Sequence, residues 1–278
     1  MKILLILMAA LLISGCQAAE STPTWPSSTP TPAPTATYTP TVTETPSPTF
    51  IPPTPSVTPS QFTVCSPLEE ETFESLPLIL VNPLRIPPIG KDSGHHGLDY
   101  AYFRRGERES IQGIEVYALL SGRTVLTLED VIPYGYTILI ETPLDQIPEQ
   151  LQEKLLAAYQ PIPDTVVYQG ECPAFETPIN TGEMSVYHLY AHLEEQPPFQ
   201  PGDSIACGEN LGTVGNSGRS SNPHLHLETR LGPSGAAFTN MAFYEATYSE
   251  QQRANYCLWR MSGHYQLFDP SHLWEALD

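Results

Sequence analysis

The stretch "SSNPHLHLETR" (220–230) places two histidines two residues apart in a run that otherwise has the composition of a β-strand. Alternate side chains of a strand lie on the same face, so we expect His224, His226 and Glu228 to face one side and the intervening leucines to face the core. Two neighbouring imidazole rings need polar partners, and a metal ion is one such partner. We expect Glu228 to be exposed and solvated, with the orientation of a histidine as the alternative role.

The stretch "SGHHGLDYAYF" (93–103) supplies the other candidate metal donors. Four residues of straight strand span about 13 Å, so His95 and Asp99 could meet one ion only if the chain bends between them. Gly97 permits such a bend. We therefore expect His95 on a loop and Asp99 at the start of a strand. Spacing alone does not separate His95 from its neighbour His96.

Most of the chain after residue 62 consists of short runs rich in β-branched and aromatic residues and punctuated by glycine, which predicts antiparallel strands. These runs lie at 114–130, 134–142, 184–193 and 211–218. The spacing of leucines predicts a helix within 144–160, and further helical pieces are expected at 248–259 and 270–277. The predicted fold class is mostly β, an antiparallel β-sheet domain with short helical insertions.

Three regions are predicted along the chain. Residues 1–15 carry a basic residue and then a short apolar run, as in a secretory signal peptide. Residues 16–61 form a tether, because 21–60 contain 12 prolines and 13 threonines and cannot build a core. Residues 62–278 form the folded domain.

The N-terminal signal ends in a run, 13–16, that resembles the lipobox of bacterial lipoproteins. We therefore expect cleavage before Cys16 and a lipid on that cysteine; an ordinary signal with a coincidental cysteine is the alternative. The lipid would hold the protein outside the cytoplasm, at the outer face of the bacterial cell membrane.

The predicted domain contains an even number of cysteines: Cys65, Cys172, Cys207 and Cys257. Outside the cytoplasm this number indicates two disulfides, and we expect Cys172 to pair with Cys207 and Cys65 with Cys257. Metal binding by the thiols is the alternative, although no C-x-x-C pair occurs. The formal net charge of −19 argues against nucleic acid as a partner.

Three motifs occur in order along the domain: "HHGLD" (95–99), "LYAHL" (189–193) and "GTVGNSGRSSNPHLHLE" (212–228). Together they resemble the lysostaphin-type zinc metallopeptidases, the LytM-like bacterial cell-wall endopeptidases. The resemblance covers about 79–232 and the later run "FDPSHL" (268–273). It implies the duplicated hybrid motif fold of that family. It also implies hydrolysis of cross-bridge or stem peptides of peptidoglycan.

The resemblance also assigns roles to single residues. His95, Asp99 and His226 would bind one Zn²⁺, which settles the choice between His95 and His96. Three protein ligands and an open position are the pattern of a catalytic rather than a structural zinc. His192 and His224 would act as bases beside the metal, because the H-E-x-x-H motif with its glutamate base does not occur.

The chain also departs from the family pattern. We expect insertions at about 141–183 and 236–265, of which the first would rim the substrate groove. His188, His264 and His272 match no motif position and are expected to be structural. Two alternatives to a wall endopeptidase remain open: a non-catalytic or regulatory wall-binding module, and a zinc peptidase acting on secreted peptides.

The lipoprotein assignment leads to a first prediction. Cys16→Ser should release the protein from membranes, because the lipid would then have no attachment site. Membrane fractions washed with high salt provide the measurement. A mutant that stays in the membrane fraction would contradict the assignment.

Overall fold

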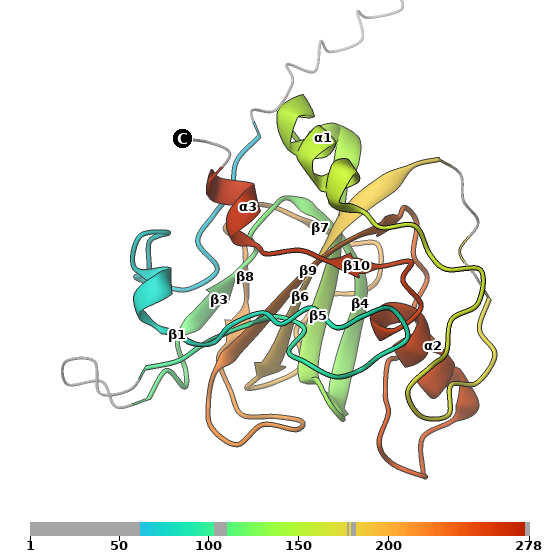
Figure 1. Ribbon diagram of the computed structural model, residues 1–278. Helices are drawn as coiled ribbons and strands as arrows, with labels where there is room; N and C mark the ends of the chain where they lie inside the picture. Colours follow the sequence, from blue (N-terminus) through green and yellow to red (C-terminus); the bar gives the residue numbers. More distant parts are fainter. Residues whose placement is uncertain (1–61, 103–109, 177, 179–181, 276–278) are drawn as a thin grey trace, which may run out of the picture. The chain divides into compact units, whose positions relative to one another are not determined.

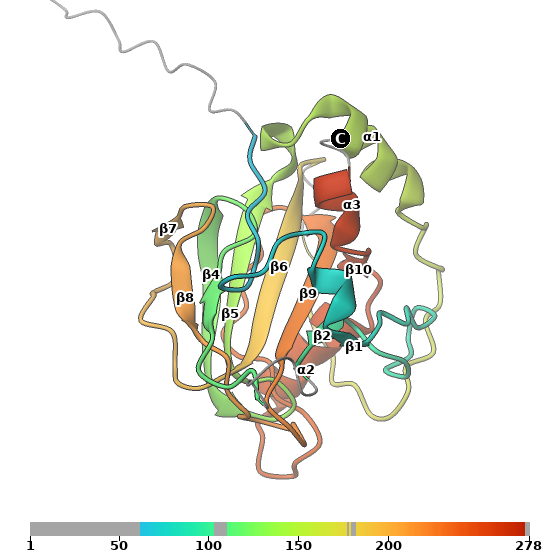
Figure 2. The same cartoon turned by 90° about the vertical axis from the view of Figure 1, so that its left-hand side faces the viewer.

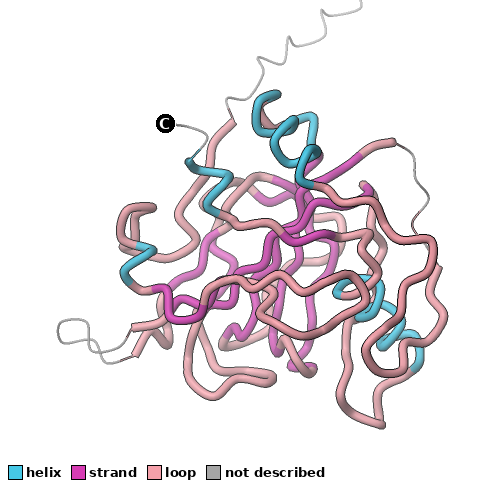
Figure 3. Tube along the Cα trace, in the orientation of Figure 1, coloured by secondary structure: helices cyan, strands magenta, loops and turns pink. Residues whose placement is uncertain are grey.

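Antiparallel pairing dominates the computed structural model, which describes residues 62–102, 110–176, 178 and 182–275 (Figure 1). The strands are β1 (Leu80–Asn82), β2 (Leu98–Tyr100), β3 (Glu115–Tyr117), β4 (Gly122–Val131), β5 (Gly135–Pro143), β6 (Met184–Leu193), β7 (Ser204–Ile205), β8 (Asn210–Thr213), β9 (Leu225–Pro233) and β10 (Gln266–Leu267). The main sheet has the order β1-β2-β9-β6-β5-β4-β7, with β10 on β9. Strands gather at the centre of the molecule and loops surround them (Figure 3). The predicted mostly β class is confirmed.

The four long strands β4, β5, β6 and β9 lie side by side at the centre of the sheet (Figure 2). Both faces of this sheet are covered, since neighbouring residues of β6 belong to different core clusters: Tyr190 to one and Leu189 to the other. The leucines of β9, Leu225 and Leu227, pack in the first cluster. Strand β9 is consequently buried along its whole length, polar residues included.

The predicted strand run 114–130 is interrupted in the structure. Its first part, β3, pairs with β8 in a separate two-stranded sheet, and its second part, β4, pairs with β5 and β7. The buried residues 118–120 connect the two sheets. The continuous apolar pattern of the sequence therefore reflects burial on both sides of a bend rather than one strand.

The three α-helices lie where their sequence patterns place them, whereas the first 3₁₀ turn was not predicted. They are the 3₁₀ turns η1 (Leu76–Leu78) and η2 (Leu144–Gln146) and the α-helices α1 (Glu149–Ala158), α2 (Glu250–Arg260) and α3 (Ser271–Trp274). Helix α2 starts with a capping box in which Ser249 Oγ accepts from the Gln252 backbone N–H (3.2 Å) and Gln252 Oε1 accepts from the Ser249 N–H (2.8 Å). Its residues Tyr256 and Trp259 pack in the second core cluster, so α2 covers one face of the sheet.

The predicted signal peptide, Cys16 and the whole predicted tether lie outside the described residues. The described residues all fall within one compact unit, Val57–Asp278. Among them, no helix has the length and apolar character needed to cross a membrane.

Two disulfides are present, as predicted, but the expected pairing is wrong. Cys65 is bonded to Cys207 and Cys172 to Cys257, with Cα–Cα distances of 5.7 and 5.9 Å. Cys65 and Cys207 meet because both segments hydrogen-bond to the turn before β4: the Cys65 N–H donates to Leu119 O (2.9 Å) and the Cys207 N–H to Ser121 Oγ (2.9 Å). Cys257 lies on the buried side of α2, and Cys172 is packed against the same core cluster.

These bridges give a second prediction. Mapping of the non-reduced protein should recover peptides that join Cys65 to Cys207 and Cys172 to Cys257, since both Cα separations suit a disulfide. Replacing Cys65 and Cys207 together by serine should lower the free energy of unfolding in urea by about 2–5 kcal/mol. Alkylation of four thiols in the native protein would show that the bridges do not form.

Candidate metal centre

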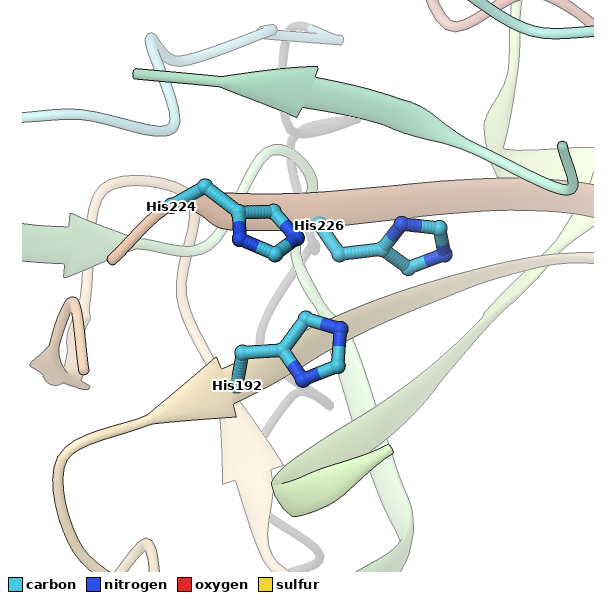
Figure 4. A group of neighbouring side chains, drawn as sticks. All are labelled: His192, His224 and His226. Atoms are coloured by element: carbon cyan, nitrogen blue, oxygen red, sulfur yellow. The ribbon is translucent and has the colours of Figure 1, made fainter. Parts of the chain in front are cut away.

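Five side chains named by the three motifs meet at one place in the sheet. Two groups of candidate metal donors share His226: His95 with Asp99, and His192 with His224. Within each group the ligand atoms lie within 4.8 Å of one another. His192 lies near the end of β6, His224 directly precedes β9 and His226 lies near the start of β9, with the three rings gathered between the strands (Figure 4).

The register of three strands produces this meeting. His226 of β9 lies opposite Asp99 of β2 on one side and opposite Ala191 of β6 on the other. His192 follows Ala191 in β6, and its ring centroid lies 5.8 Å from that of His226. His95 precedes β2 in a bridge with Arg85, so it lies outside the strand as expected.

Backbone geometry tightens the site at two residues. A Cβ on Gly97 would lie 2.5 Å from the Leu227 carbonyl oxygen and 2.9 Å from His226 Nε2, so only glycine lets this turn approach β9. His192 has φ +62°, an uncommon conformation for a residue other than glycine. Its N–H donates to Tyr134 O (2.9 Å) and its carbonyl accepts from the Gly215 N–H (3.0 Å), which holds this conformation in place.

Asp99 is the centre of the first donor group. Its Oδ2 lies 3.0 Å from His95 Nε2 and its Oδ1 lies 2.7 Å from His226 Nδ1. The Asn82 side-chain amide donates to Oδ2 (2.9 Å) and orients the carboxylate. Two imidazoles and a carboxylate, close enough to share one ion, are a common donor set for catalytic zinc. These residues therefore fit a zinc ion, and the carboxylate would offset part of its charge.

Each histidine of the site forms a hydrogen bond through one ring nitrogen, and this bond determines which nitrogen faces the site. His95, His192 and His224 each place Nδ1 on a backbone carbonyl, at 3.0, 2.8 and 2.8 Å respectively. A carbonyl only accepts, so Nδ1 carries the proton and Nε2 presents its lone pair to the site. In His226 the roles are reversed, with Nε2 at 3.2 Å from Glu228 Oε1 and Nδ1 facing Asp99. Such anchoring is typical of metal-ligating histidines.

The pKa values divide four of the five site residues, Asp99, His226, His192 and His224, into two kinds. Burial alone would raise the pKa of Asp99, but hydrogen bonds from His226 and His95 outweigh burial and hold this pKa far below its usual range. Burial alone would lower the pKa of His226, yet Asp99 and Glu228 raise it to about 9. Burial, followed by the charges on His226 and His224, lowers the pKa of His192 to about 3. Burial likewise lowers the pKa of His224. At neutral pH, His192 and His224 are therefore neutral, with free Nε2 lone pairs.

His95 and His96 point to opposite sides of the chain. His95 faces Asp99, as the motif implies. His96 is 1% exposed, and its Nδ1 accepts from Arg230 Nη2 at 2.8 Å. Spacing in the sequence could not distinguish these two neighbours, but in the folded protein they contact different residues.

The expectation that Glu228 is solvated is wrong. Glu228 is 0% exposed, because α2 covers the face of β9 on which it lies. It accepts hydrogen bonds from the Tyr134 hydroxyl and the Trp259 indole as well as from His226. The alternative role, orientation of a histidine, matches these contacts. Sequence reasoning found no sign of Tyr134, Trp259 or Asn82 at the site, since none of them belongs to a motif position.

The remaining histidines lie outside both donor groups. His188 is fully buried, where it bonds to Thr142 Oγ1 (3.2 Å) and the Tyr190 hydroxyl (2.9 Å). His264 and His272 belong to neither group. The four domain cysteines are bonded to each other and are not thiol ligands.

A comparison with protein families finds a match to peptidase family M23 over residues 163–238. This segment contains the second and third motifs, with His192, His224 and His226, and excludes His95 and Asp99. No curated protein matches the chain.

Solved structures of peptidases show similarity at low identity. One is a putative peptidase M23 from Pseudomonas aeruginosa (19% identity, 62% of this chain, 49% of that chain, TM-score 0.28). A second is a zinc containing peptidase from Vibrio cholerae (18%, 61% and 34%, TM-score 0.29). A third is the catalytic domain of lysostaphin from Staphylococcus simulans (19%, 60% and 91%, TM-score 0.35). The chain spans half or less of the first two relatives. The family indicated by the three motifs is thus supported by an independent match of residues 163–238 to peptidase family M23.

Proposed function

We propose that this protein is a zinc-dependent endopeptidase that hydrolyses cross-bridge or stem peptides of peptidoglycan at the cell surface. One observation carries the proposal: a charged donor group, His95, Asp99 and His226, lies directly beside two neutral histidines whose lone pairs face it. The family match supports peptidase chemistry for this arrangement.

His95, Asp99 and His226 are the residues that would hold the metal. When bound, zinc supplies Lewis acidity and lowers the pKa of a coordinated water toward ~7. The group of His192, His224 and His226 would offer a divalent ion three neutral ligands, whereas the first group also offers a carboxylate. Asp99 provides that carboxylate and stays ionised at neutral pH, since its pKa is strongly lowered.

His192 and His224 are placed to move a proton. Their Nδ1 atoms are held by the carbonyls of Ser217 and Asn222, so each Nε2 keeps its direction during the reaction. A proton taken from the attacking water would reside on Nε2, and His224 Nε2 lies 3.5 Å from Asp99 Oδ1, which stabilises the resulting cation. Because burial lowers the pKa of both rings, the proton is readily passed on to the leaving amine.

The substrate and the location are proposed from the sequence. The formal net charge of −19 suits a substrate that is neutral or carries amines. The lipobox-like run before Cys16 and the proline-rich tether would place the domain near the wall from a membrane anchor. The regulatory alternative would call for a missing ligand or base, and this chain keeps all five residues.

The proposed division of labour can be tested by substitution. His95→Ala, Asp99→Ala or His226→Ala removes a ligand, so zinc content and hydrolysis should both fall. His192→Ala or His224→Ala should keep the zinc while turnover drops by about 10² or more, the usual contribution of a positioned base. Zinc is measured by atomic spectroscopy and hydrolysis by new amino termini released from peptidoglycan.

His272→Ala serves as the matched control and should change neither quantity, because His272 belongs to neither donor group. A wild-type protein that carries one zinc and releases no amino termini from walls of different cross-bridge chemistry would contradict the proposal. Loss of zinc from His192→Ala would contradict the assignment of ligands and bases.

A further inference from the structure

A buried carboxylate lies behind the metal ligand His226. Glu228 Oε1 accepts from His226 Nε2 at 3.2 Å and from the Tyr134 hydroxyl at 2.9 Å. Glu228 Oε2 accepts from Arg230 Nε at 3.0 Å and from Trp259 Nε1 at 3.2 Å. Each oxygen thus has its own donors, and His226 is bonded to only one of them.

Arg230 anchors this carboxylate rigidly. Besides Glu228, its guanidinium donates through Nη1 to the carbonyls of Trp259 and Tyr265 (2.9 Å each) and through Nη2 to His96 Nδ1 (2.8 Å). Together with the contacts of Nε and Nη2 to Glu228 Oε2, these bonds use all five N–H donors of the side chain. A guanidinium that is 1% exposed and fully bonded cannot turn without breaking several hydrogen bonds.

Helix α2 provides a further contact to Glu228. Arg260 Nη1 lies 3.7 Å from Glu228 Oε1, and its Nε donates to Asp92 Oδ1 at 2.7 Å. The helix is fixed by the Cys172–Cys257 bridge. The 236–265 segment, expected as an insertion, therefore reaches the residue behind the metal ligand.

We propose that Glu228 is a positioning residue for His226, and that helix α2 holds Glu228 in place through Trp259 and Arg260. This inference rests on the proposed zinc site. An ionised carboxylate can only accept, so Glu228 requires the proton of His226 to lie on Nε2. The Nδ1 lone pair then remains available for the metal beside Asp99.

Glu228→Gln tests the orientation directly. Arg230 and the Trp259 indole both donate toward the position of Oε2, so the amide oxygen of glutamine should occupy it and the NH₂ group should face His226. A donor opposite Nε2 favours the tautomer with the proton on Nδ1, where it competes with zinc. Zinc affinity should fall by about 10- to 100-fold, the usual effect of losing such a partner.

Two measurements report this change without any enzymatic assay. Competition with a chromophoric chelator gives the zinc dissociation constant of each variant. In the zinc-loaded wild type, the proton on His226 Nε2 should give a downfield NMR resonance because it is bonded to a carboxylate. That resonance should move upfield in Glu228→Gln.

Glu141→Gln is the matched control. Glu141 is also a buried carboxylate of the main sheet, 3% exposed, and it accepts from Ser185 Oγ (2.9 Å) and the Gly235 N–H (2.6 Å). It belongs to neither donor group, so its substitution should leave zinc affinity unchanged. Unchanged affinity in Glu228→Gln, or an equal loss in both variants, would overturn the inference.

A second pair of variants covers the case in which Glu228→Gln does not fold. Arg260→Met should weaken zinc binding by about 10-fold, whereas Arg253→Met, the same change on the same helix, should not. Equal affinities in this pair would overturn the role of α2. If the wild-type protein binds no zinc, the proposed function and this inference are both overturned. If the wild-type protein binds zinc tightly and the variants bind it equally well, only the inference is overturned.

Discussion

The pairing of β9 with β2 and β6 is the constraint on which the site depends. His226 and Asp99 are 127 residues apart in the chain, yet their side chains meet at 2.7 Å because β2 and β9 are in register there. A slip of one residue would turn every side chain of β9 to the opposite face. His226 would then face the leucine cluster, and both donor groups would be lost. The leucines of β9 prevent this slip, since they are fully buried in that cluster.

The same sheet explains why polar residues are buried so deeply behind the site. Because both faces of β9 are covered, Glu228 and Arg230 cannot reach solvent and must find their partners inside the protein. Glu228 stays ionised although it is buried. Burial alone would raise the pKa of Glu228, but Arg230, His226 and Arg260 hold this pKa well below its usual range. A buried carboxylate that stays charged is a strong acceptor with a fixed direction. The fold thus fixes the orientation of His226 through Glu228 before any ion is present.

The motifs named five residues that the structure brings together, but the sequence did not reveal which residues surround them. Alternation on β9 correctly grouped His224, His226 and Glu228 on one face, and Gly97 was correctly expected to permit the bend before Asp99. Spacing could not choose between His95 and His96, because the choice depends on which side of the turn faces β9. The burial of Glu228 was missed since it comes from α2, which lies far along the chain. The disulfide pairing failed for a similar reason, as it depends on which loops meet in space rather than on spacing.

The central claim is that His95, Asp99 and His226 hold the metal and that His192 and His224 do not. Crystals of the zinc-loaded protein measured at the zinc absorption edge would locate the ion by its anomalous scattering. The account predicts one peak, coordinated by His95 Nε2, an Asp99 carboxylate oxygen and His226 Nδ1. A peak held by His192, His224 and His226 with Asp99 unliganded would contradict it.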